Sequence, residues 1–176
     1  MSASPQPGPG GRSRNPATAR HSAARLAAVQ ALYQMEIAGS GPAATVEEFE
    51  RFRLGAADPE SSGGRKVNQK LFAALVGGVE ENRETLDALI APRLAGGWSV
   101  DRLEVILRAI LRLGAFELRY RVETPARAVV SEYVRLADSF FSGAEPGMVN
   151  GVLDAVARAV RPGEMERGHG GDAPSG

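Results

Sequence analysis

Five polar side chains near the start of the chain have the chemistry of an RNA-binding surface. Arginine side chains can hold phosphates while a tyrosine ring stacks on an unpaired base, the usual arrangement for single-stranded RNA. Residues 1–35 contain no acidic residue, so an arm of positive charge precedes the tyrosine. The residues alone leave a plainer interpretation open, in which the arm is solvated and the tyrosine is half buried with its hydroxyl at the surface. The five candidates are Arg20, His21, Arg25, Gln30 and Tyr33.

The pair Asn150-Gly151 is the second unusual feature. An Asn-Gly pair normally indicates a turn, but the apolar period from Val149 to Val160 continues through it and favours a helix. Glycine inside a helix costs about 1 kcal/mol relative to alanine. We therefore expect a structural role, in which Gly151 allows another helix to approach closely and Asn150 satisfies nearby backbone groups.

The sequence contains no recognisable catalytic or metal centre. There is no cysteine, which excludes a disulfide scaffold, a thiolate metal site and a cysteine nucleophile. The two histidines, His21 and His169, lie near opposite ends of the chain, and no phosphate-binding loop or zinc-binding helix pattern is present. We predict no catalytic residues, no metal and no cofactor.

The elements that must position these residues are all helical. Apolar residues recur at helical spacing, no strand alternation is present, and we predict an all-α, compact bundle of about seven helices. A disordered N-terminal arm is expected at residues 1–16 and a disordered C-terminal tail at 163–176, leaving 17–162 as the helical RNA-binding domain. The predicted helices cover about residues 17–38, 43–54, 66–81, 82–95, 100–118, 125–141 and 146–160, with a loop at 55–65.

One of these helices should lie at the centre of the bundle. The stretch from Val100 to Leu118, which Ser99 is expected to cap, is apolar around most of its circumference. Only Glu104, Arg108 and Arg112 form a polar stripe along it. In the helix at 66–81, the pair Gly77-Gly78 should allow close helix packing.

The composition is that of a globular protein, with 43% hydrophobic and 24% charged residues and a net charge of zero. No stretch is apolar enough for long enough to span a bilayer, and the N-terminus has no apolar run typical of a secretory signal. We therefore expect a cytoplasmic protein that has no membrane contact.

Four segments, in this order, resemble the NusB family of bacterial transcription antitermination factors. The resemblance covers about residues 20–162 and departs from the family's usual pattern at Gly147 and Met148, where a lysine and an aromatic residue are common. The segments are AVQALYQ at 28–34 with the arginines before it, ILRLGAFEL at 110–118, TPARAVVSEYVRLADSFF at 124–141 and EPGMVNGVLDAVA at 145–157.

The resemblance implies two packed helical subdomains and no catalytic activity. It implies binding of boxA RNA, from the leader of ribosomal RNA transcripts, together with NusE, a small-subunit ribosomal protein, in an RNA polymerase antitermination complex. It places the RNA on Arg20, His21, Arg25, Gln30 and Tyr33. It places the partner protein at the start of the last helix, on Glu145, Pro146, Gly147 and Met148.

Two other functions remain as alternatives. The first is a related RNA-recognition domain, of the kind found in ribosomal RNA cytosine methyltransferases, which also need a nucleotide-binding domain and a cysteine nucleophile. The second is a self-associating helical scaffold that has no RNA role. Members of the family can bury the partner surface in a homodimer, so self-association is compatible with the antitermination hypothesis, and an RNA titration separates the two.

Overall fold

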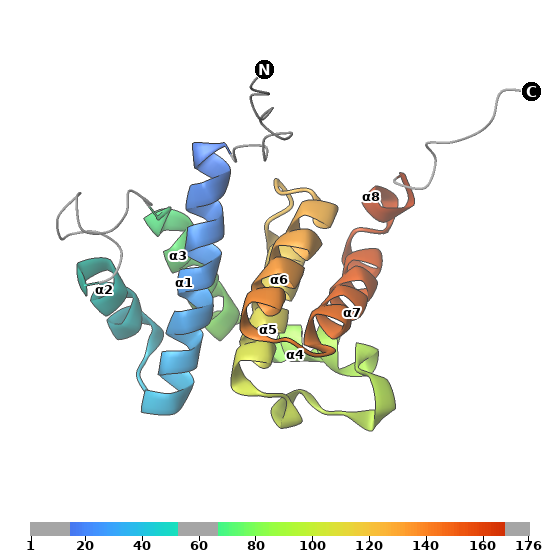
Figure 1. Ribbon diagram of the computed structural model, residues 1–176, viewed down its shortest axis with the longest axis horizontal. Helices are drawn as coiled ribbons and strands as arrows, with labels where there is room; N and C mark the ends of the chain where they lie inside the picture. Colours follow the sequence, from blue (N-terminus) through green and yellow to red (C-terminus); the bar gives the residue numbers. More distant parts are fainter. Residues whose placement is uncertain (1–14, 53–66, 168–176) are drawn as a thin grey trace, which may run out of the picture.

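The computed structural model describes residues 15–52 and 67–167, and this part of the chain is helical without any strand (Figure 1). The all-α prediction is confirmed. The arm at residues 1–14, the predicted loop at 55–65 and residues 168–176 lie outside the described residues. The α-helices are α1 (Pro16–Ala38), α2 (Pro42–Phe52), α3 (Gln69–Glu81), α4 (Arg83–Ile90), α5 (Val105–Tyr120), α6 (Ala126–Phe140), α7 (Glu145–Val160) and α8 (Pro162–Arg167).

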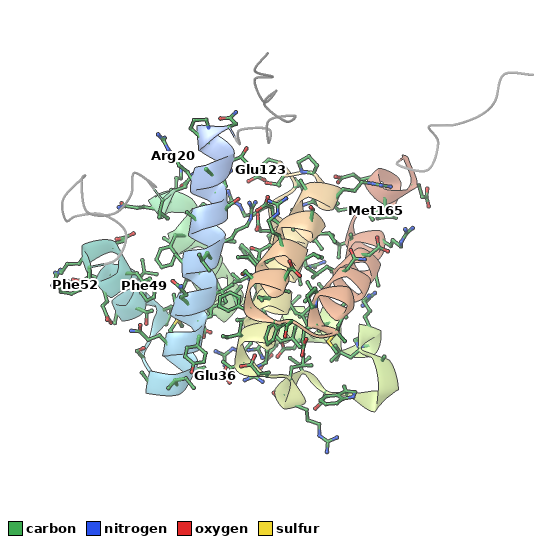
Figure 2. All side chains as sticks on the ribbon, in the orientation of Figure 1. Arg20, Glu36, Phe49, Phe52, Glu123 and Met165 are labelled. Atoms are coloured by element: carbon green, nitrogen blue, oxygen red, sulfur yellow. The ribbon has the colours of Figure 1, made fainter. Side chains whose placement is uncertain are left out.

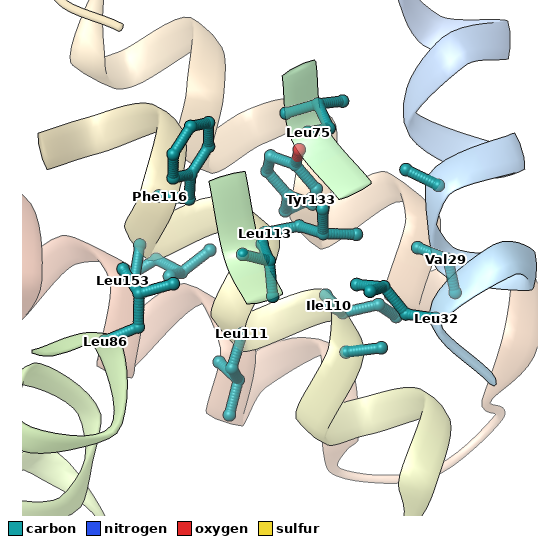
Figure 3. Packing of buried hydrophobic residues seen from close by; sticks show 14 of the residues in the cluster. Val29, Leu32, Leu75, Leu86, Ile110, Leu111, Leu113, Phe116, Tyr133 and Leu153 are labelled. Carbon is teal, nitrogen blue, oxygen red and sulfur yellow. The ribbon is translucent and has the colours of Figure 1, made fainter. Parts of the chain in front are cut away.

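Helix α5 is the centre of the bundle. Every residue from Leu107 to Leu118 is buried. Helices α1 and α3 pack on one side of α5, with α2 against them, and α4, α6 and α7 pack on the other. Figure 3 shows side chains from both groups meeting in one core around Ile110 and Leu113. No helix in the described part of the chain is long and apolar enough to cross a membrane.

Helix α1 has well-defined ends, and its predicted end at about residue 38, before Gly39, is confirmed. Asn15 accepts a hydrogen bond from the amide of Ala17 at 3.0 Å, and Pro16 occupies the first helical position. Gly39 adopts the left-handed conformation, with φ of 68°, and its amide donates to the carbonyl of Met35 at 2.8 Å. The helix therefore runs unbroken through all five residues that the sequence analysis assigned to RNA.

The start of the central helix differs from the prediction. Ser99 does not cap it, because the residues Val100–Arg102 form a short 3-10 turn and α5 begins at Val105. The carboxylate of Glu104 accepts hydrogen bonds from the amides of Ile106 and Leu107 and so caps the helix instead. The Arg108 guanidinium donates to three carbonyl groups in the turn, which holds that segment out of the helix; these belong to Val100, Asp101 and Leu103.

The C-terminal boundary of the predicted domain also needs correction. Residues 162–167, most of which were expected to be disordered, form helix α8, and its Met165 side chain is buried. Glu164 accepts a hydrogen bond from the amide of Ala126 at 2.6 Å and so supports the start of α6. A helix of six residues is too short to show an amphipathic period, which is why the sequence pattern missed it.

Close helix contacts occur at Gly78 and Gly114, whereas Gly151 makes none. A β-carbon at Gly114 would lie 2.5 Å from a methyl group of Leu153, and one at Gly78 would lie 2.2 Å from the Phe116 ring. Gly151 is exposed and would have nothing within 4 Å of its β-carbon. The prediction of close packing at Gly151 is therefore wrong, and Asn150 is likewise exposed, without a side-chain hydrogen bond in the described part of the chain.

Two glycine-to-alanine substitutions test this difference. Gly114→Ala should lower the free energy of unfolding by about 1–3 kcal/mol, because Leu153 is fully buried and has no room to move away. Gly151→Ala should raise it by about 0.5–1 kcal/mol, because alanine loses less backbone entropy in a helix. Urea unfolding followed by circular dichroism measures both values. A stable Gly114→Ala variant together with a destabilised Gly151→Ala variant would contradict the packing described here.

Candidate nucleic-acid interface

Gln30 and Tyr33 lie on the exposed face of α1, one helical turn apart. The Tyr33 side chain is 41% exposed although its ring is large and apolar. Both residues line a groove of about 350 Å³, together with Ile37 of the same helix and the side chains of Ile106 and Phe140 from α5 and α6. An exposed aromatic face beside an apolar groove and an amide group is suited to stacking on an unpaired base.

Arg20 and His21 lie at the other end of the helix and on a different side of it. Both are exposed, and Figure 2 shows Arg20 at the end of the bundle where α1 begins, with Glu36 near the opposite end. The carbonyl of Arg20 accepts a hydrogen bond from the amide of Asn68, so the start of α3 lies beside this turn. Because twelve residues separate His21 from Tyr33, the two positions are about 18 Å apart along the helix axis.

Arg25 is not on this surface. Its side chain is 4% exposed and forms a bidentate ion pair with Glu117 of α5, with Nε 2.7 Å from Oε2 and Nη2 2.9 Å from Oε1. The hydroxyl of Tyr133, on α6, donates a third hydrogen bond to Oε2 at 2.5 Å. The guanidinium is thus occupied inside the protein, and the predicted contact between Arg25 and RNA is corrected to a structural role.

The charges in this buried cluster stabilise one another. Burial by itself lowers the pKa of Arg25, but the hydrogen bond and the negative charge of Glu117 outweigh it, so the pKa is raised and the guanidinium stays charged. Burial, followed by the charge of Glu117, raises the pKa of Tyr133 well above its usual value, so its hydroxyl keeps the proton that it donates. The cluster joins α1 to α5 and α6 and thereby sets the orientation of the helix that carries Tyr33.

Two further arginines of α5 hold neighbouring helices in the same way. Arg108 pairs with Glu36 near the end of α1, and Arg112 makes a bidentate pair with Asp87 of α4, with both distances 2.8 Å. The sequence pattern placed these arginines in a polar stripe with Glu104, and the structure shows that both arginines are buried and ion-paired whereas Glu104 is exposed. Glu117, which the sequence analysis missed, was visible only as an acidic residue near the end of a strongly apolar helix.

The four residues assigned to a protein partner form the first turn of α7, at the end of the bundle away from the start of α1 (Figure 1). Gly147 is exposed with open space around it, whereas Met148 is half buried and packs against the core. One oxygen of Glu145, Oε2, is buried without a hydrogen-bond partner among the described residues. An acceptor of this kind is costly to leave unpaired, and an incoming donor would satisfy it.

Comparisons with known proteins place this helical fold in a defined class. The T. maritima NusB structure covers 83% of this chain and 96% of its own, with a TM-score of 0.66 and 26% sequence identity. A crystal structure of antitermination factors NusB and NusE in complex with dsRNA matches with a TM-score of 0.64 at 27% identity, covering 78% of this chain and 96% of that one. The fold is therefore that of the NusB structures.

Sequence relatives agree with this assignment. The NusB family model matches residues 22–158. The transcription antitermination protein NusB of Caulobacter vibrioides is 48% identical over 140 residues, which is 80% of this chain and 93% of that protein. NusB of Rhodopseudomonas palustris strain BisB18 is 48% identical over 149 residues, which is 85% and 88% of the two chains. The chain belongs to the NusB family.

Proposed function

We propose that this chain is a transcription antitermination factor that binds boxA RNA of ribosomal RNA leader transcripts together with NusE. Bound to RNA polymerase as part of that complex, it suppresses premature termination. The observation that carries the proposal is membership of the NusB family over most of the chain, combined with the match to a NusB–NusE–dsRNA complex. The groove beside Tyr33 supplies a surface on which RNA bases can stack.

The RNA surface extends along α1. Gln30 and Tyr33 contact bases at the apolar groove, and Arg20 and His21 contact phosphates near the start of the helix. Since these two positions are about 18 Å apart, the RNA follows an extended path along the helix. Arg25 supports this path without touching the RNA, because its ion pair with Glu117 holds α1 against α5.

The partner protein docks on the first turn of α7. The open surface at Gly147 allows a partner backbone to approach closely, and Met148 supplies an adaptable apolar contact. The carboxylate of Glu145 accepts a hydrogen bond from the partner once its side chain turns outward. This surface lies at the opposite end of the bundle from the start of α1 (Figure 1). It shares no residue with the groove at Tyr33, so RNA and partner occupy separate surfaces and bind at the same time.

Gly147→Glu should weaken binding to the ribosomal-protein partner at least tenfold, because it places a long charged side chain where the partner approaches. The fold should remain intact, since a β-carbon at Gly147 has nothing within 4 Å. Ala159→Glu, an exposed position near the end of α7, is the matched control and should bind normally. Calorimetry with the purified partner compares the two variants. Equal dissociation constants would show that the first turn of α7 is not the interface.

We infer that the protein acts by binding alone and works in the cytoplasm, where ribosomal RNA is transcribed. The buried charged groups of α5 are ion-paired and hold neighbouring helices together. The direct test is a transcription assay with purified RNA polymerase, NusE and a template that carries boxA upstream of a terminator. Adding the protein should increase read-through only when boxA is present, and read-through that is independent of the protein would contradict the proposal.

A further inference from the structure

We propose that the small groove beside the start of α1 binds a phosphodiester group of the RNA backbone, with His21, Lys70 and Arg121 as the contacting side chains. The inference rests on the proposed RNA-binding function and adds a second contact site to it. The groove has a volume of about 170 Å³ and lies between α1, the first turn of α3 and the connection from α5 to α6. This space holds one phosphate group with a few water molecules.

Three helices bring the contacting groups to the groove. His21 comes from the second turn of α1, Lys70 from the first turn of α3 and Arg121 from the residue that follows α5. Their side chains are exposed or half buried, so all three are accessible. None of them belongs to the groove at Tyr33, which α1, α5 and α6 form at the other end of α1.

The charge of the groove is positive. Its floor is the Arg25–Glu117 ion pair, whose charges cancel each other. The one other carboxylate that lines it, Glu123, pairs with Arg121 at 3.0 Å but is 63% exposed. Lys70 and Arg121 thus set two positive charges against one negative charge, and a phosphate displaces the weak exposed pair with little loss.

Hydrogen bonds outside the groove fix the backbone segments that form its walls. Arg161, which is buried, donates hydrogen bonds to the carbonyls of Arg121 at 2.9 Å and Thr124 at 2.6 Å, and so fixes the connection after α5. The hydrogen bond from the Asn68 amide to the Arg20 carbonyl, at 3.3 Å, holds the start of α3 against α1. A site whose backbone is already fixed loses little entropy when it binds.

The position of the groove fits one continuous RNA strand. Arg20 lies beside it at the same end of the bundle, where Figure 2 also shows Glu123. The stacking groove at Tyr33 lies about 18 Å further along α1. The phosphate site therefore anchors the part of the RNA that extends beyond the stacked bases, and it contributes to affinity through charge, independent of base sequence.

The test is a titration of boxA-containing RNA with the full chain at several salt concentrations. For single-stranded RNA each lost phosphate contact lowers the magnitude of the salt slope by about 0.7, so Lys70→Gln combined with Arg121→Gln, which removes the contact with one phosphate, should lower it by about 0.7. The matched control combines Arg102→Gln with Arg158→Gln, which removes the same charge at two exposed positions outside the groove. The control variant should keep the wild-type slope.

Glu123→Gln tests the same site by an expected gain in RNA affinity. It should raise the affinity about twofold and leave stability unchanged, because it removes the one carboxylate that competes with the phosphate for Arg121 and breaks only an exposed pair. Equal slopes for the groove double variant and the wild type, while Tyr33→Ala still weakens binding, would overturn the phosphate site and leave the RNA function intact. Equal losses in the groove and control variants would also overturn it, and a wild type that binds no boxA RNA would overturn both proposals.

Discussion

Replacing Arg25 with alanine is expected to lower the free energy of unfolding by about 3–5 kcal/mol. The substitution would leave the Glu117 carboxylate fully buried, with the hydroxyl of Tyr133 as its remaining close partner in the described structure. A buried charge that loses its counter-ion is among the most costly single changes in a protein. Urea unfolding followed by circular dichroism measures the loss.

The exposed Arg102 is the matched control, and Arg102→Ala should change stability by no more than about 0.5 kcal/mol. Arg25→Lys keeps the charge but loses the bidentate geometry, so it should fall between the two and remain folded for RNA measurements. The lysine variant should bind boxA RNA with the wild-type salt slope. An Arg25→Ala protein that has wild-type stability and binds boxA RNA with a lowered salt slope would instead restore Arg25 as a direct RNA contact.

Tyr33→Ala is expected to weaken binding of boxA RNA by about 1–3 kcal/mol, because the ring that stacks on a base is lost. Tyr33→Phe should keep most of the affinity, since the ring remains and only the hydroxyl is removed. Trp98, another exposed aromatic side chain, lies before α5 and outside the groove, so Trp98→Ala is the control and should bind RNA normally. Equal affinities for wild type and Tyr33→Ala would leave Tyr33 as an ordinary surface residue.

Helical periodicity was sufficient to predict most of the fold. The long apolar stretch of α5 predicted a buried central helix, and residues 107–118 are all buried. The end of α1 at Gly39 followed from glycine at a helix terminus. Local patterns could not predict α8, because its position depends on contacts made by Met165 and Glu164 with distant residues.

The candidate site was harder to predict, because side-chain type alone does not distinguish a surface arginine from a buried one. Arg25 stands in a basic segment, and its partner Glu117 lies 92 positions later in the chain. Glycine presents the same problem: the pattern places both Gly114 and Gly151 inside helices, but only the neighbouring helix decides which of them is in close contact. Gly114 faces Leu153, whereas Gly151 faces open space.

An equilibrium titration of boxA-containing RNA, with and without purified NusE, tests the central claim most directly. The chain is expected to bind this RNA and NusE to tighten the binding, whereas an RNA of the same composition in scrambled order should bind at least tenfold more weakly. Equal affinity for the boxA and scrambled RNAs in the presence of NusE would contradict the account.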